Sequence, residues 1–121
     1  MKGLRSLPVA RGRTVRRQSG QMNLTEARYE AEMLRPRLMA GDYCAIWFER
    51  FTFRVADDCR YTPDFVVQLA NGELEVHEVK GFWEDDALVK IKVAADLFPF
   101  RFVAVQAIPK KSGGGWKERE F

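Results

Sequence analysis

The stretch from Tyr61 to Lys80 constrains the fold most, because it has the pattern of a β-hairpin. Residues 65–69 and 74–79 are rich in β-branched and other apolar side chains, and Ala70-Asn71-Gly72 lies between them. Strands joined by so short a loop pair with each other and present alternate side chains to opposite faces. The sequence therefore predicts two adjacent antiparallel strands around which the rest of the chain packs.

The length of the loop decides which charged side chains meet at the open end of this hairpin. A two-residue loop would set Asp64 opposite Val79, and Asp64 and Glu78 would then point to opposite faces. A three-residue loop, with Gly72 in the left-handed conformation, sets Asp64 opposite Glu78. We predict the three-residue loop, with the facing Cβ atoms roughly 4.5–5.5 Å apart and Lys80 on the same face.

Two carboxylates that face each other across a strand pair repel unless a cation lies between them. Their oxygens suit Mg²⁺ or Mn²⁺, so the sequence predicts a divalent metal site at Asp64 and Glu78, with the Val79 carbonyl as a further ligand. Lys80 would orient water or stabilise developing charge, because neighbouring carboxylates disfavour the low pKa that a base needs. The alternative is a salt-bridged hairpin end, in which Asp64, Glu78 and Lys80 only neutralise one another.

These residues carry a resemblance. Pro63-Asp64, a spacer and then Glu78-Val79-Lys80 resemble the PD-(D/E)XK nuclease superfamily. Two longer runs are similar to the phage endonuclease I family, nucleases that resolve Holliday junctions and cut branched DNA: Tyr61-Thr62-Pro63-Asp64-Phe65 and Glu78-Val79-Lys80-Gly81-Phe82-Trp83-Glu84-Asp85-Asp86. The resemblance spans about residues 24–105. It implies a restriction-endonuclease-like nuclease core, that is, an α/β fold with a mixed β-sheet flanked by helices. It also implies a Mg²⁺- or Mn²⁺-dependent endodeoxyribonuclease.

The segment from residue 23 to residue 41 has the pattern of a helix. Asn23 and Glu26 have the spacing of a capping box, Pro36 predicts a local break, and Gly41 predicts the end. One apolar stripe falls at helical spacing, and we expect it to face the core: Leu24, Ala27, Ala31, Leu34 and Leu38.

Two glutamates of this helix are candidates for the site. The resemblance implies that Glu26, at the start of the helix, is a third metal-site carboxylate, and Glu30 is the alternative if the helix has another phase. Without the resemblance, Glu26 is a cap and Glu30 a solvated charge. Glu49 also falls where the related nucleases carry acidic residues, but an edge charge is the preferred interpretation. His77, the single histidine, faces away from Glu78 in the predicted register, and we expect a structural role.

The remaining elements complete an α/β pattern. Residues 44–53 predict two strands or one bent strand with Glu49-Arg50 at the bend, and Asp57-Asp58 predicts a turn. Residues 87–98 predict a helix so apolar that we expect it to be largely covered, and residues 101–106 predict an interior strand. Lys90 and Lys92 are the cations of this helix and candidate contacts for DNA phosphates.

Charge divides the chain into an arm and a body. Residues 1–22 hold six basic residues and no acidic one, which leaves 14 basic and 17 acidic residues in 23–121. We predict a disordered basic arm, followed by a single nuclease domain over residues 23–121. Arg11, Arg13, Arg16 and Arg17 are candidate nucleic-acid contacts, although a solvated tail explains the same composition.

The expected partners follow from composition and from the resemblance. No run of 18 apolar residues and no signal sequence is present, so we expect no membrane and a cytoplasmic protein, of a bacterial host if phage- or mobile-element-encoded. Two symmetric cuts in a DNA junction require two active sites, so that substrate implies a homodimer. The alternatives are a general duplex or single-strand phage nuclease and a catalytically silent DNA-binding module.

Overall fold

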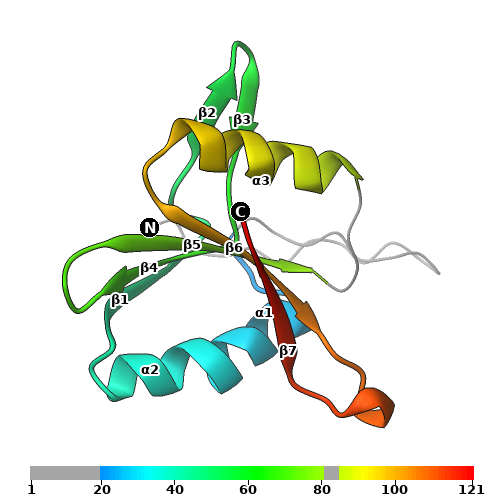
Figure 1. Cartoon of the computed structure of the whole chain (residues 1–121). Coiled ribbons are helices and arrows are strands. Elements are labelled where there is room, and N and C mark those ends of the chain that lie inside the picture. Colours follow the sequence, from blue (N-terminus) through cyan, green and yellow to red (C-terminus); the bar gives the residue numbers. More distant parts are fainter. Residues whose placement is uncertain (1–19, 81–84) are drawn as a thin grey trace, which may run out of the picture.

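A five-stranded mixed sheet forms the centre of the protein (Figure 1). The computed structural model describes residues 20–80 and 85–121, with side chains from Leu88 onward in the second stretch. The strand order is β1-β4-β5-β6-β7, with β5 and β6 parallel and the other neighbours antiparallel. The strands are β1 (Tyr43–Phe48), β4 (Phe65–Leu69), β5 (Leu74–Lys80), β6 (Arg101–Ala107) and β7 (Trp116–Glu120). The predicted α/β fold with a mixed sheet is confirmed.

Helical segments lie on both faces of this sheet (Figure 1). One face packs against a continuous helical segment, α1 (Leu24–Tyr29), η1 (Glu30–Leu34) and α2 (Arg35–Met39); we call it the α1 face. The other, the α3 face, packs against α3 (Asp85–Leu97) and the small hairpin of β2 (Phe53–Ala56) and β3 (Cys59–Tyr61). The buried strand residues divide accordingly, for example Val79 to the α1 face and Val76 to the α3 face.

The β4–β5 hairpin has the predicted three-residue loop. Phe65 pairs with His77, the Leu69 N–H donates to the Glu73 carbonyl at 2.8 Å, and Gly72 has a φ of 93°. The same register, continued by one pair, sets Asp64 opposite Glu78. The left-handed conformation of one glycine thus decides which charged residues meet at the open end of the hairpin.

We expect Gly72→Ala to lower the free energy of unfolding by about 1 kcal/mol, because an L-residue is strained at this φ. A Cβ atom at this position would meet nothing within 4 Å, so the cost comes from the backbone alone. Gly72→Asn is the control and should cost less, because asparagine tolerates the left-handed region better. Urea unfolding of both variants checks this, and an equal loss in the two would contradict it.

The helix that begins at Leu24 keeps its predicted cap and its predicted break. Asn23 Oδ1 accepts the Glu26 N–H at 2.8 Å, and Glu26 Oε1 accepts the Asn23 N–H at 2.9 Å. Before Pro36 the helix widens into the π-helical turn η1, and the Arg35 N–H donates to the Glu30 carbonyl. The chain absorbs the proline by this local change of helical pitch and remains helical to Met39.

The predicted apolar stripe of this helix is wrong. Of its members only Leu34 is buried, and Leu24 is 79% exposed. The buried side begins instead with Glu26 and Tyr29, because the Tyr29 hydroxyl reaches His77 on β5 and turns that side toward the sheet. The π-helical turn then shifts the phase, so that Leu34 joins the buried side one turn later.

The helix α3 begins two residues earlier than predicted and is covered on one side only. Its first turn includes Asp85 and Asp86. Ile91 and Ala94 are buried against the sheet, but Val89 and Leu97 are 57% and 54% exposed. The expectation of a largely covered helix is therefore wrong. Along the chain, α3 connects β5 to β6, and these two strands pair in parallel.

The β1 and β2 strands are separate, as one of the two predicted alternatives requires. They belong to different sheets, and Glu49, with a φ of 52°, lies at the bend between them. Asp57 and Asp58 form the predicted turn between β2 and β3, where Asp57 bonds to Arg54 at 2.6 Å.

Candidate functional site

The open end of the β4–β5 hairpin brings together Asp64, Glu78 and Lys80. Asp64 precedes β4 and is 6% exposed, and its Oδ2 accepts the Val79 N–H at 2.8 Å. Glu78 is 5% exposed, and its Oε1 accepts the Tyr61 hydroxyl at 2.7 Å. The Lys80 Nζ lies 3.1 Å from Glu78 Oε2. The predicted cluster of two carboxylates and one ammonium group is therefore present and largely buried.

A second group of carboxylates shares Asp64. Side-chain oxygens of Glu26, Glu49 and Asp64 all lie within 4.8 Å of one another. The capping box places Glu26 in the first turn of α1, and the Glu49 N–H donates to the Asp64 carbonyl at 2.9 Å. Three segments that are distant in the sequence thus converge on one point.

The structure separates the two glutamates that the sequence left as alternatives for this group. Glu26 is 3% exposed and lies in the group, whereas the Glu30 carboxylate bonds to Arg35 at 2.8 Å, away from it. Glu49 was expected to be an edge charge; it follows the edge strand β1 and is partly exposed, and it also contributes a carboxylate to this group. The β1–β4 register sets Phe48 opposite Phe65 and so brings the next residue, Glu49, beside Asp64. Nothing local in the sequence indicates that register.

Glu78 does not belong to the group of three carboxylates. One of its oxygens accepts Tyr61 and the other faces Lys80. Glu78 lies opposite Asp64 as predicted, and its role as a metal ligand stays a prediction. A buried carboxylate takes the nearest donors, and the two donors of Glu78 lie within 3.1 Å.

The protonation of the site follows from burial and from like charge. Burial, then the charges of Glu78 and Glu26, raise the pKa of Asp64 to about 8, against the opposing effect of the Val79 N–H. Burial alone would lower the pKa of Lys80, but Glu78, Asp64 and Glu26 outweigh it and raise that pKa above its ordinary value. Burial and Glu78 also raise the pKa of Tyr61, so it remains a neutral donor. Lys80 is therefore a fixed positive charge at neutral pH.

The donor set of the group of three fits a divalent cation. Glu26, Glu49 and Asp64 offer carboxylate oxygens, the ligands that Mg²⁺ and Mn²⁺ prefer. The Val79 N–H points toward Asp64, and in a strand the carbonyl of the same residue points to the same side. In the hairpin register that carbonyl faces Pro63, which has no N–H to donate. The Val79 carbonyl, the expected backbone ligand, is thus directed to the β4 side of β5, where Asp64 lies.

The predicted structural role of His77 agrees with its contacts on the α1 face. A hydrogen bond of 2.6 Å joins the Tyr29 hydroxyl to His77 Nδ1, and one of 3.1 Å joins His77 Nε2 to Glu75 Oε1. Glu75 also pairs with Arg101 at 3.1 Å. These bonds connect α1 to β5 one residue away from Glu78. Sequence analysis missed Tyr29, because its spacing does not fit the stripe that was expected to be buried.

The cations predicted to contact DNA are only partly placed. The Lys90 Nζ donates to the Arg60 carbonyl at 3.3 Å, and Lys92 is exposed on α3. Four others lie outside the described residues, as does the segment between β5 and α3 at 81–84: Arg11, Arg13, Arg16 and Arg17. Of the predicted arm, the structure describes only residues 20–22.

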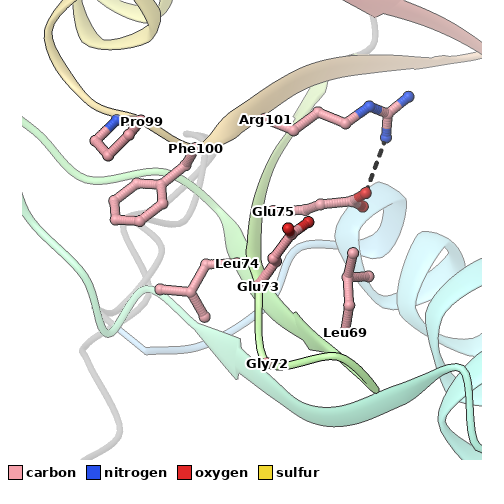
Figure 2. Close-up of a pocket in the computed structure, with 8 residues that line it drawn as sticks. All are labelled: Leu69, Gly72, Glu73, Leu74, Glu75, Pro99, Phe100 and Arg101. Atoms are coloured by element: carbon pink, nitrogen blue, oxygen red, sulfur yellow. Dashed lines mark hydrogen bonds and ion pairs between the residues drawn. The ribbon is translucent and has the colours of Figure 1, made fainter.

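A pocket of about 440 Å³ lies at the other end of the hairpin, near its loop (Figure 2). Its walls include Leu74, Phe100 and the Glu75–Arg101 ion pair drawn in the figure. None of the predicted site residues lines it. Its one paired carboxylate, Glu75, is already bonded to both Arg101 and His77. We therefore do not assign the candidate chemistry to this pocket.

Comparisons with protein-family models, with curated proteins and with solved structures found no match to this chain. Over residues 20–80 and 85–121, every helix is too short or too polar to cross a membrane. The assignment of a function therefore depends on the chemistry of the residues themselves.

Proposed function

We propose that this chain is a metal-dependent DNA endonuclease that hydrolyses phosphodiester bonds, with branched DNA such as Holliday junctions as its substrate. One observation carries the proposal: the oxygens of Glu26, Glu49 and Asp64 lie within 4.8 Å of one another beside the ion pair of buried Glu78 and half-buried Lys80. Buried carboxylates in such numbers are unfavourable without a cation, and hydrolysis of a phosphodiester uses one. The resemblance around Asp64 and Glu78 favours a nuclease among metal-dependent hydrolases.

Each residue of the site has a distinct part in this proposal. Glu26, Glu49, Asp64 and the Val79 carbonyl would hold Mg²⁺ or Mn²⁺. The bound ion supplies Lewis acidity toward a phosphate oxygen and lowers the pKa of a water molecule. Lys80, protonated and held by Glu78 at 3.1 Å, would stabilise the negative charge that develops on the phosphate. A protonated lysine is a poor base, which favours this electrostatic role.

The biological setting is proposed on the same basis. A four-way junction is resolved by two symmetric cuts, so we infer a homodimer that presents two such sites. We place the protein in the cytoplasm, where its DNA substrate would lie. Nucleic-acid binding is assigned to the basic residues of the first 17 positions and to the α3 cations Lys90 and Lys92.

Cleavage of three labelled substrates tests the proposal: a four-way junction, a linear duplex of matched sequence and a single strand, each with Mg²⁺ or with EDTA. We expect Mg²⁺-dependent, paired cuts in the junction only. Equal cutting of all three substrates would support a general nuclease and exclude the junction preference. Tight binding without any cutting would overturn the proposed activity and support a silent binding module.

A further inference from the structure

In the last strand, β7, the positively and negatively charged side chains lie on opposite faces of the sheet. Lys117 pairs with Gln106 and Arg119 with Ala104, and Ala104 is buried among the residues of the α3 face. Because side chains alternate along a strand, Lys117 and Arg119 lie on the α3 face, while Glu118 and Glu120 lie on the α1 face. Both cations are exposed.

The two cations of β7 are in register with the candidate site. The parallel β5–β6 pairing sets Glu78 beside Ala104 and Lys80 beside Gln106. The rows therefore continue across the sheet as Glu78–Ala104–Arg119 and Lys80–Gln106–Lys117. Adjacent strands lie about 4.8 Å apart, so the backbone of β7 is about 10 Å from that of β5 on the same face.

The charged residues of β7 differ in their ion pairing: Glu120, on the α1 face, is paired with Arg101. On the α1 side, arginines lie against carboxylates, as in Arg35–Glu30 at 2.8 Å and Arg101–Glu120 at 3.1 Å. Among residues 20–80 and 85–121, neither Lys117 nor Arg119 is in an ion pair, and Arg119 lies over the Phe121 ring at 4.8 Å. Two cations without an ion-pair partner thus lie beside a site rich in carboxylates. The carboxylates alone would repel a polyanion, and the two cations oppose that repulsion.

We propose that Lys117 and Arg119 form a phosphate-binding track that holds the backbone of a nucleic acid on the β7 side of the candidate site. The inference rests on the proposed function for the identity of the polyanion. The aligned rows then place bound phosphates on the same face as Lys80. The track carries no base recognition, because its contacts are to the backbone alone. The track is a further nucleic-acid-binding surface besides the arm and α3, and it lies on a strand of the central sheet.

The double variant Lys117→Gln/Arg119→Gln tests the track through duplex binding in EDTA, where cleavage is suppressed. Each phosphate contact contributes about 0.9 to the slope of log K against log salt concentration. We expect the slope to become shallower by about 1 to 2 and the affinity to fall. The matched control, Arg35→Gln/Arg37→Gln on α2, removes the same charge from the opposite side and should leave the slope unchanged. Thermal unfolding of both variants confirms that they fold.

Three outcomes would overturn the track: an unchanged slope in the β7 variant, an equal change in both variants, or no binding of duplex by the wild-type protein. An equal change would indicate an effect of net charge alone. None of these decides the proposed activity, which is measured separately by Mg²⁺-dependent cleavage. A wild-type protein that cuts DNA with an unchanged slope in the β7 variant would exclude the track and retain the nuclease.

Discussion

Asp64→Asn is expected to lower Mg²⁺-dependent cleavage by roughly 10²-fold or more, while nucleic-acid binding in EDTA is retained. Asp64 is the one residue that belongs to both the carboxylate group of Glu26 and Glu49 and the pair with Glu78. Asparagine has the same shape and can still accept the Val79 N–H, so the hairpin end should keep its structure. Cleavage of the labelled junction under single-turnover conditions measures the effect.

The control for this variant is Asp57→Asn. Asp57 lies in the β2–β3 turn, its side chain is 90% exposed, and its bond is to the neighbouring Arg54. The Asp57→Asn substitution makes the same chemical change as Asp64→Asn but away from the site, and we expect it to leave cleavage unaffected. Full activity in Asp64→Asn would remove Asp64 from the mechanism, and with it the proposed metal centre.

In the metal-free protein, we expect the free energy of unfolding to fall by on the order of 1–3 kcal/mol between about pH 4 and pH 8. In the folded state Asp64 has a pKa of about 8, against 3.8 ordinarily. Across this range the folded protein holds a proton on Asp64 that the unfolded chain has released. The unfolded state therefore binds fewer protons, and stability is lost as the pH rises. Urea unfolding in EDTA at several pH values measures the loss.

Two comparisons isolate the contribution of Asp64. Asp64→Asn carries no ionisable group at this position, so its stability should decline less over the same range. Mg²⁺ added to the wild-type protein at pH 8 should raise the free energy of unfolding, because an ion that binds only the folded state stabilises it. An identical pH dependence in wild type and variant would show that Asp64 ionises normally in the folded protein. No effect of Mg²⁺ or Mn²⁺ on stability would speak against the metal centre.

Local rules of sequence were enough to predict the hairpin and the helix cap. The position of Gly72 determines the loop, and the loop determines that Asp64 faces Glu78. The spacing of Asn23 and Glu26 likewise predicted a cap that the structure contains. Both features depend on residues a few positions apart, where backbone geometry leaves few alternatives.

Features that depend on tertiary pairing were not predictable in the same way. Glu49 reaches Asp64 because β1 pairs with β4 in one particular register, and its own surroundings in the sequence give no sign of it. Tyr29 is buried because it bonds to His77, although the apolar periodicity of the helix favours another side. The exposure of Val89 on α3 has the same origin, since hydrophobicity alone does not say which side of a helix the sheet covers.

The convergence of distant segments on Asp64 has a consequence for the order in which the protein folds. The β4–β5 hairpin closes over a short stretch of chain, and hairpins form within microseconds, so Asp64 and Glu78 can meet early. Glu49 and Glu26 arrive only when β1 has paired with β4 and α1 has docked, and closing these longer loops is slower. We therefore expect the three-carboxylate group to be completed late in folding, once the native strand pairing and helix docking are in place.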